Sequence, residues 1–422
     1  MEQTKKSGSY GFVIVVSLFI QMFLAGSILM TAGMFIVPVT TSLNLTQGVY
    51  MLYMTIQYGT MAVMGIFMPK LLSKFKFVTL NRFAIVVMAL GAFCMAMAKN
   101  VALIYVGGVF LGASMVIATY QSAAILIPRF FKTRVGVMLA TATMGTTFAG
   151  AIMSPVISKM LTKATVFGME PWRGIYVMLG AVLLVIGLIN AIALLRENPK
   201  DGVRYGEDQA DVVEGQPAAE SKGIMKEKAV KSTSFIFFVL MVVTFNFAAP
   251  VQSYLPAYAG LSEAAQTASF DVVGILASVV LIASVIGNYA IGFANDKFGA
   301  RGGATLAGVC GVVGFIVLLM AKNSAGMMLA GGAFFGLYYP ISGLIMPAML
   351  LNMYGDKDYN RIFPVAAAWG PWFGAVAASL WGFIYDATGS YNTVFVIALI
   401  LCACTALFTI LGVKSSKKLW KE

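Results

Sequence analysis

Long apolar segments recur along almost the whole chain, and they constrain its fold more than any other feature. Runs of roughly 18 or more apolar residues are too long and too frequent to be buried helices of a soluble protein. Only 11% of the 422 residues are charged, whereas a soluble chain would carry about 25%. The mean hydropathy of +0.86 agrees. The sequence therefore predicts a protein whose bulk lies in lipid.

We count twelve apolar runs, each bounded by charged or turn-forming residues. Because backbone polar groups in hydrocarbon must bond to one another, each run is expected to be a helix. The runs cover residues 11–37, 49–69, 80–98, 101–127, 135–158, 174–195, 233–256, 272–294, 303–321, 324–353, 362–385 and 391–413. The first run is longer than a signal-peptide core, so we interpret it as a retained span.

Lysine and arginine are unevenly distributed between the predicted loops, and this bias orients the chain. If both termini lie in the cytoplasm, 24 of the 29 basic residues fall on the inner side. The outer side then holds Lys99, Lys159, Lys163, Arg173 and Lys322. Because inner loops are enriched in basic residues, we expect a multi-pass protein of the cell membrane with both termini cytoplasmic.

One stretch, residues 196–232, has the composition of a soluble segment, with seven basic and eight acidic residues. It predicts a cytoplasmic linker, either disordered or carrying a short surface helix. Short motifs recur on its two sides at offsets of 223 to 227 residues. The predicted fold is therefore an all-α membrane protein, with twelve transmembrane helices in two pseudo-symmetric six-helix bundles, residues 1–195 and 233–422.

Composition also excludes several classes of function. The net charge of +12 lies in short loops, not in the basic stripe with interleaved aromatics that binds nucleic acid. The chain has no histidine and no C-x-x-C pair, so we expect no metal and no cofactor. The spans lack the paired carboxylates, histidines or activated nucleophile that an enzyme would need.

The segment between the eighth and ninth runs reads Gly292-Phe-Ala-Asn-Asp296-Lys297-Phe-Gly299-Ala-Arg301. Gly292 permits close helix approach, Gly299 permits a tight turn, and Asp296 can pair with a cation or cap a helix. This resembles the signature loop of the major facilitator superfamily, G-x-x-x-D-[RK]-x-G-x-[RK]. The resemblance implies a secondary transporter in which these residues form a cytoplasmic latch.

The matching segment of the first half departs from this pattern. Ser73 stands where the family has aspartate, and Lys76 stands where it has glycine, so a latch there would lack its carboxylate. Trp172-Arg173 and Tyr385-Asp386-Ala-Thr-Gly389 are similar to other family elements. Within the superfamily, the chain most resembles the oxalate/formate antiporters and monocarboxylate porters.

No run has an Asp, Glu, Lys or Arg near its centre, although such residues usually mark function within a membrane. Uncharged polar and aromatic residues remain at midplane depth, where such folds bind solute between their halves. We expect a substrate site formed by Gln21, Gln57, Tyr120, Gln121, Asn246, Asn288, Tyr338 and Trp369. The alternatives for each are hydrogen bonding between helices or a place at the lipid interface.

The oxalate/formate branch carries an arginine in span eight and a lysine in span eleven that meet the substrate carboxylates. Asn288 and Gly370 stand at these positions here, which argues against oxalate itself. The sequence therefore favours a monocarboxylate or related organic anion, moved by alternating access as an antiporter or symporter. A facilitator or exchanger of a neutral or aromatic solute is an alternative, as is a non-transporting receptor.

Coupling to protons would need a titratable group that changes environment during the cycle. Asp271, at the outer end of the eighth run, is the candidate. The expected partners are the small organic solute and membrane lipids, and we expect a monomer.

Overall fold

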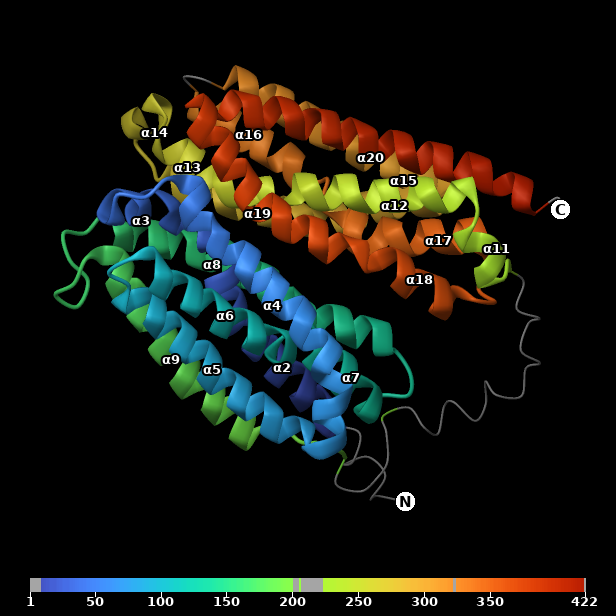
Figure 1. Ribbon diagram of the computed structural model, residues 1–422, viewed down its shortest axis with the longest axis horizontal. Helices are drawn as coiled ribbons and strands as arrows, with labels where there is room; N and C mark the ends of the chain where they lie inside the picture. Colours follow the sequence, from blue (N-terminus) through green and yellow to red (C-terminus); the bar gives the residue numbers. More distant parts are fainter. Residues whose placement is uncertain (1–8, 200–204, 206–222, 322–323, 421–422) are drawn as a thin grey trace. The chain divides into compact units, whose positions relative to one another are not determined.

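The computed structural model describes residues 9–199, 205, 223–321 and 324–420. Within them all regular secondary structure is helical (Figure 1). Eleven helical segments of the described chain are long and apolar enough to cross a membrane. Because hydrocarbon offers no partner for a backbone amide, helices that bond internally are the expected result. The prediction of an all-α membrane protein is confirmed.

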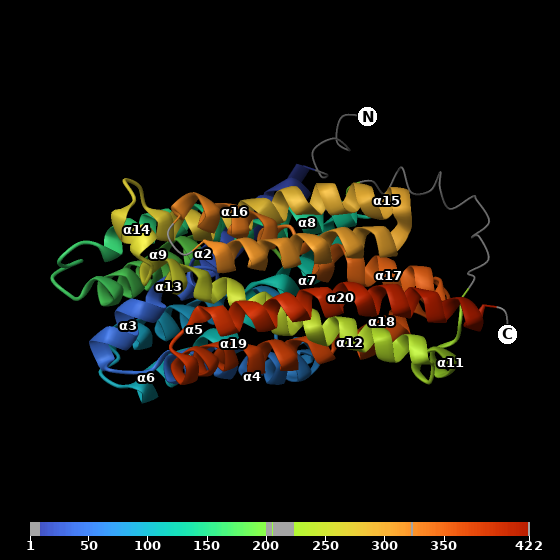
Figure 2. The same ribbon diagram turned by 90° about the horizontal axis from the view of Figure 1, so that it is seen from above.

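The count of eleven differs from the predicted twelve at one helix, α15 (Val272–Met320), which has 49 residues. Gly299 interrupts it with φ 70° and ψ −179°. A Cβ atom at Gly303 would lie 3.3 Å from the carbonyl oxygen of Ile291, although twelve residues of straight helix extend about 18 Å. The helix therefore reverses direction (Figure 2), and its halves correspond to the predicted spans 272–294 and 303–321.

The chain divides into two compact units. The first comprises residues 1–38 and 56–218, and the second comprises residues 39–55 and 219–422. Helix α4 (Gln47–Lys74) belongs to both units, since the division falls between Thr55 and Ile56. Most of the predicted linker lies outside the described residues, so the predicted bundle limits at 195 and 233 stay a prediction.

The first unit also contains α2 (Ser9–Leu29), η1 (Ala32–Phe35), the start of α3 (Ile36–Leu43), α5 (Phe77–Met97), α6 (Val101–Ala118), α7 (Tyr120–Phe130), α8 (Val135–Leu161) and α9 (Pro171–Ala193). Helix α5 packs between α6 and α9, while α2 packs on α8. A Cβ at Gly26 of α2 would lie 2.7 Å from Cα of Thr146. Small residues thus let these backbones approach closely, as is common where lipid provides no hydrophobic drive.

The second unit contains α11 (Lys226–Val230), α12 (Thr233–Ala248), η2 (Ala249–Tyr254), α13 (Leu255–Gly260), α14 (Glu263–Thr267), α15, α16 (Ala325–Gly336), η3 (Ile341–Ile345), α17 (Met346–Tyr354), α18 (Tyr359–Ala367), α19 (Trp369–Thr388) and α20 (Tyr391–Leu419). Helices α12 and α20 run side by side (Figures 1 and 2). Helix α15 packs on both α16 and α20.

Five spans of the described chain are interrupted within their length, and four of them recur at every third position. Span one breaks at η1, span four at Thr119 between α6 and α7, span seven at η2, and span ten at the π-helical segment η3. Each of these four is the first helix of a successive group of three. The fifth, span eleven, is interrupted at Ala368 between α18 and α19. Such breaks leave backbone carbonyls without their helical partners, and these carbonyls need side chains to bond them.

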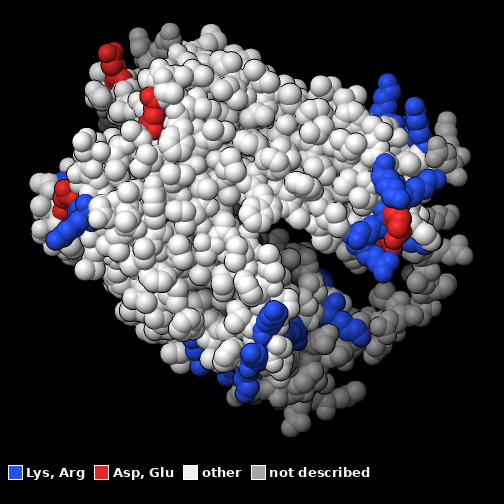
Figure 3. All heavy atoms as spheres, in the orientation of Figure 1, with Lys and Arg blue, Asp and Glu red and all other residues white. Residues whose placement is uncertain are grey.

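Charged side chains lie mainly at the helix ends. On the face shown in Figure 3, Lys, Arg, Asp and Glu gather at these ends, and the surface between them is uncharged. Exposed apolar side chains such as Ile66, Ile189 and Ile286 contribute to the outer surfaces of the helices. This distribution is the one expected of helices that cross a hydrocarbon layer.

Candidate functional site

The break in span four gathers polar side chains of the first unit. Thr119 has φ −116° and ψ −115°, which ends α6 and frees carbonyls of its last turn. The Nε2 atom of Gln21 donates to the carbonyl of Ala118 at 2.7 Å, and the hydroxyl of Ser122 donates to that of Ile117 at 2.6 Å. Buried side chains therefore replace the missing helical bonds, which offsets the cost of interrupting a membrane helix.

Gln57 contacts the same turn of α6. Its side chain is buried, and its Nε2 donates to the thioether sulfur of Met115 at 2.9 Å. Gln21 and Gln57 thus bond to residues one helical turn apart. The structure therefore brings together two of the predicted site residues. Gln121 is half-buried in α7, just after the break, whereas the side chain of Tyr120 lies outside the described residues.

Several buried polar atoms of this unit accept no hydrogen bond from any described residue. They are Oε1 of Gln21, Oδ1 of Asn81, Oδ1 of Asn190 and the hydroxyl of Ser17. An unsatisfied buried acceptor costs about 1–3 kcal/mol. Each of these oxygens therefore has a lone pair that a buried water could bond.

The break in span seven is bonded in a similar way within the second unit. The indole nitrogen of Trp381 donates to the carbonyl of Phe247 at 2.9 Å, and the hydroxyl of Tyr339 donates to that of Ala249. Asn246 lies just before this break, where its Nδ2 bonds its own helix at Val242.

Asn246 and Gly370 are immediate neighbours. A Cβ atom at Gly370 would lie 2.8 Å from Nδ2 of Asn246, so any larger residue at Gly370 would displace this amide. The sequence comparison of span eleven placed Gly370 where the oxalate/formate branch has a lysine. In this chain, Asn246 takes up space that such a side chain would need.

Tyr338 is fully buried inside the second unit. Its hydroxyl bonds that of Thr405 at 2.8 Å, and Thr405 in turn bonds Thr244 at 2.9 Å. This arrangement links three helices. It corresponds to the alternative given in the sequence analysis, in which Tyr338 forms hydrogen bonds between helices and does not line the solute site.

Asn288 and Trp369 are exposed. The Nδ2 of Asn288 bonds Ser284 of its own helix at 3.1 Å. Trp369 is 48% exposed and stacks on Phe373 at a centroid distance of 6.3 Å. Among the described residues, no hydrogen bond links either side chain to another predicted site residue.

The signature segment of α15 adopts a turn at Gly299 with positive φ, as its glycine predicts. Asp296 and Lys297 are exposed, and Lys297 lies 5.4 Å from the ring centroid of Phe298. Arg301 is half-buried, and the described residues include no ion pair between it and Asp296. The role of this segment as a latch stays a prediction.

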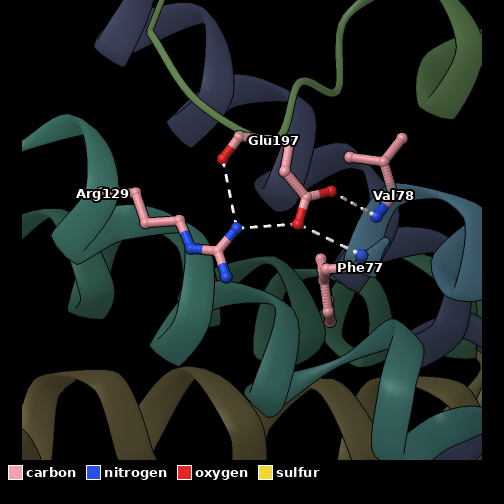
Figure 4. A network of polar contacts seen from close by, with 4 residues as sticks. All are labelled: Phe77, Val78, Arg129 and Glu197. Carbon is pink, nitrogen blue, oxygen red and sulfur yellow. Dashed lines mark hydrogen bonds and ion pairs between the residues drawn. The ribbon is translucent and has the colours of Figure 1, made fainter. Parts of the chain in front are cut away.

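The sequence analysis missed the polar network around Glu197 (Figure 4). Its carboxylate accepts hydrogen bonds from the backbone nitrogens of Phe77 at 3.2 Å and Val78 at 3.1 Å, and pairs with Arg129 at 2.8 Å. The carboxylate therefore caps the start of α5. Burial raises the pKa of this carboxyl, but the three hydrogen bonds and the charge of Arg129 outweigh burial and lower the pKa overall.

Arg173 binds the opposite end of α5. Its guanidinium donates to the carbonyls of Ala96 at 3.1 Å and Ala98 at 2.6 Å, and pairs with Glu170 at 2.7 Å. An anion at the start of a helix and a cation at its end both complement the helix dipole. The Trp172-Arg173 element of the sequence analysis thus has a structural role in this unit.

A second carboxylate, that of Asp386, caps the start of α4 within the second unit. It accepts bonds from the backbone nitrogens of Gln47 at 3.0 Å and Gly48 at 2.7 Å. Gln47 also accepts a bond from the hydroxyl of Tyr391 at 2.5 Å, and Thr55 donates to the carbonyl of Ala375 at 2.6 Å. We call this set of contacts the α4–α19 contact.

Asp271 is the first residue before α15, and its carboxylate caps that helix by accepting a bond from Gly274 at 3.0 Å. This contact accounts for the carboxylate structurally, and its part in proton coupling stays a prediction.

Comparison with known proteins agrees with this geometry. A family model described as Major Facilitator Superfamily matches residues 18–268 and 260–421. A hexuronate transporter of Bacillus subtilis (strain 168) is 25% identical over 274 residues; the match covers 60% of this chain and 59% of that protein. The chain therefore spans about three fifths of the curated relative that it matches.

Solved transporters share the fold at low identity. A D-xylose–proton symporter superposes with a TM-score of 0.75 at 12% identity, covering 95% of this chain and 97% of that one. A bacterial homologue of the human lysosomal transporter Spinster, in an inward-facing and unoccupied conformation, gives 0.69 at 13% identity, covering 98% of both chains. The nucleoside transporter NupG gives 0.68 at 12% identity, covering 96% and 98%.

Proposed function

Since the chain belongs to the major facilitator superfamily, whose members are secondary transporters of small solutes, we propose that it carries a monocarboxylate or related organic anion. The solute would cross the cell membrane by alternating access, with both termini of the protein in the cytoplasm. The observation that supports this most directly is the uncharged polar groups gathered at interrupted spans of each unit. In transporters, such breaks mark the solute site.

The proposed solute contacts come from both halves of the sequence. Gln21, Gln57, Tyr120 and Gln121 belong to the first half, and Asn246, Asn288 and Trp369 belong to the second. Amide groups offer both donors and acceptors, and an exposed indole ring can stack on an apolar part of the solute. Tyr338, which is bonded to Thr405, would position span ten and not touch the solute.

The absence of intramembrane cations at Asn288 and Gly370 favours a solute with one carboxylate over a dianion. Neutral amides can bond a single carboxylate, but they compensate two negative charges poorly in a medium of low dielectric. The hexuronate transporter supports this choice, because hexuronates are sugar acids with one carboxylate and several hydroxyls. The Oε1 atom of Gln21, beside the break of span four, would suit such a hydroxyl.

A neutral solute is the second candidate, and the same lack of charge at midplane depth favours it. Counterflow into proteoliposomes distinguishes the two, with labelled glucuronate and lactate as anions and labelled xylose as a neutral solute. Anions should exchange and xylose should not. Exchange of xylose alone would replace the proposal with a neutral facilitator, and no exchange of any solute would favour a receptor.

One variant sharpens this test. Asn246→Asp places a negative charge beside Gly370 and should lower anion exchange about tenfold or more through repulsion. Asn392→Asp adds the same charge at the exposed start of α20 and should leave exchange unchanged. Equal exchange by both variants would remove Asn246 from the solute site.

A further inference from the structure

A groove outside the proposed solute site runs along one face of α15 and reaches α20. Its volume is about 650 Å³, and its lining includes Phe298, Arg301, Thr305, Leu306, Val309 and Ile410. The α15 residues after the turn at Gly299 recur at helical spacing, so they line one face of its second half. The groove is apolar everywhere except near Arg301 and Thr305.

The guanidinium of Arg301 has donors without acceptors. Its Nε and Nη2 atoms are buried, and neither bonds any described residue. The hydroxyl of Thr305 is already used, since it donates to the carbonyl of Arg301 at 2.7 Å. An unpaired cation in such surroundings is costly, and part of this half-buried side chain lines the groove, where an anion from outside the chain could offset its charge.

The rest of the groove is suited to a hydrocarbon chain. Leu306 is 41% exposed and Val309 is 51% exposed, as apolar side chains that face lipid on a membrane-spanning helix would be. Close packing closes the groove on one side, because a Cβ at Gly308 would lie 2.5 Å from Cβ of Ala406 in α20. The apolar surface suits the acyl chain of a phospholipid, and the cation at the helix end suits its phosphate.

We propose that this groove binds one anionic phospholipid, with its phosphate on Arg301 and an acyl chain along Leu306, Val309 and Ile410. The planar guanidinium suits phosphate because it can donate two parallel hydrogen bonds. Arg301 also lies in the first turn after Gly299, where the positive end of the helix dipole favours an anion. The exposed Lys297, four residues earlier in the chain, adds positive charge, and the exposed Asp296 opposes it.

The test uses the purified full-length protein, delipidated in neutral detergent and titrated with phosphatidylglycerol while native mass spectrometry counts bound lipids. Phosphatidylcholine, whose headgroup is neutral, and soluble glycerol 3-phosphate are the comparison ligands. Phosphatidylglycerol should bind first and at one site. Arg301→Gln should weaken that binding about tenfold, the loss expected for a charged hydrogen bond, whereas Arg361→Gln, which removes an exposed cation outside the groove, should not.

Two further variants separate the headgroup from the chain. Val309→Trp fills the groove and should weaken phosphatidylglycerol binding while Arg301 is intact. Arg301→Lys keeps the charge and guards against a folding defect, and should retain more binding than Arg301→Gln. Equal binding of both lipids, unchanged binding by Arg301→Gln, or binding of glycerol 3-phosphate as tight as that of phosphatidylglycerol would each overturn the proposal.

Discussion

At the scale of single residues, charges at helix ends organise the described part of each unit. Glu197 caps the start of α5 and Arg173 binds its end, while Asp386 caps α4 and Asp271 caps α15. Each of these charges lies outside the apolar centre of its span. They therefore stabilise helix ends without the cost of placing a charge in hydrocarbon.

Glu197→Gln should lower the stability of the protein by about 1 kcal/mol, because it removes an anionic cap and the partner of Arg129. The carboxyl's lowered pKa means that its contribution is fully present above the ordinary pKa of glutamate. That contribution is lost as the pH falls through the lowered value. Thermal unfolding should therefore separate wild type from variant at pH 7, and the difference should shrink progressively as the pH falls below the ordinary pKa of glutamate.

The control for this prediction is Glu263→Gln. Glu263 is exposed, so its neutralisation should change the unfolding temperature little over the same pH range. A difference between wild type and Glu197→Gln that grew as the pH fell would contradict the proposed cap.

At the scale of elements, interrupted helices and glycine contacts shape the spans. The breaks at Thr119 and at η2 free carbonyls, which Gln21 and Trp381 then bond. The turn at Gly299 divides α15 into two antiparallel spans. The breaks at Thr119 and η2 therefore introduce bonded polar groups into spans that are otherwise apolar.

Gly299→Ala should destabilise the protein by about 1–2 kcal/mol, because φ of 70° with extended ψ is strained for a residue with a Cβ. Gly292→Ala, in the same segment, should cost less, since its Cβ would only make an ordinary contact of 3.6 Å with Leu344. Thermal unfolding of both variants in detergent checks the order. An equal loss of stability in the two variants would mean that a Cβ atom at residue 299 causes no additional backbone strain.

The α4–α19 contact gives a prediction about movement. Under the proposed function, contacts at the start of α4 break and re-form during transport, and Asp386→Asn should weaken them by removing the charge at the helix start. In a variant without native cysteines, Ser379→Cys should then react several-fold faster with an impermeant maleimide. Asp356→Asn, at an exposed site, is the matched control, and an unchanged rate in Asp386→Asn would exclude this movement.

At the scale of the whole molecule, the orientation proposed from the loop charges puts both signature segments on the cytoplasmic side of the membrane. Cysteines at Ser73 and Lys297, which are both exposed, should react with an impermeant reagent only from the cytoplasmic side. A cysteine at Lys163 should react only from outside. Labelling of Ser73 and Lys297 from opposite sides would contradict the repeat and the orientation proposed from the loop charges.

The candidate site was only partly predictable from the sequence. Gln21, Gln57 and Asn246 were selected by depth, and they lie at or beside helix breaks. Tyr338 was selected by the same criterion but is bonded inside its unit, because depth along a helix says nothing about which way a side chain faces. Glu197 was missed because its partners are 68 to 120 residues away.

The sequence alone determined that this chain is a helical membrane protein and roughly where its spans lie, because hydrocarbon permits only internally bonded helices of a set length. It also identified the family from one short charged loop. Only the tertiary structure decided where spans one, four, seven and ten break and which carboxylates cap them. These breaks and caps depend on carbonyls and side chains from segments that are far apart in the sequence. A local sequence pattern does not show which of them come into contact.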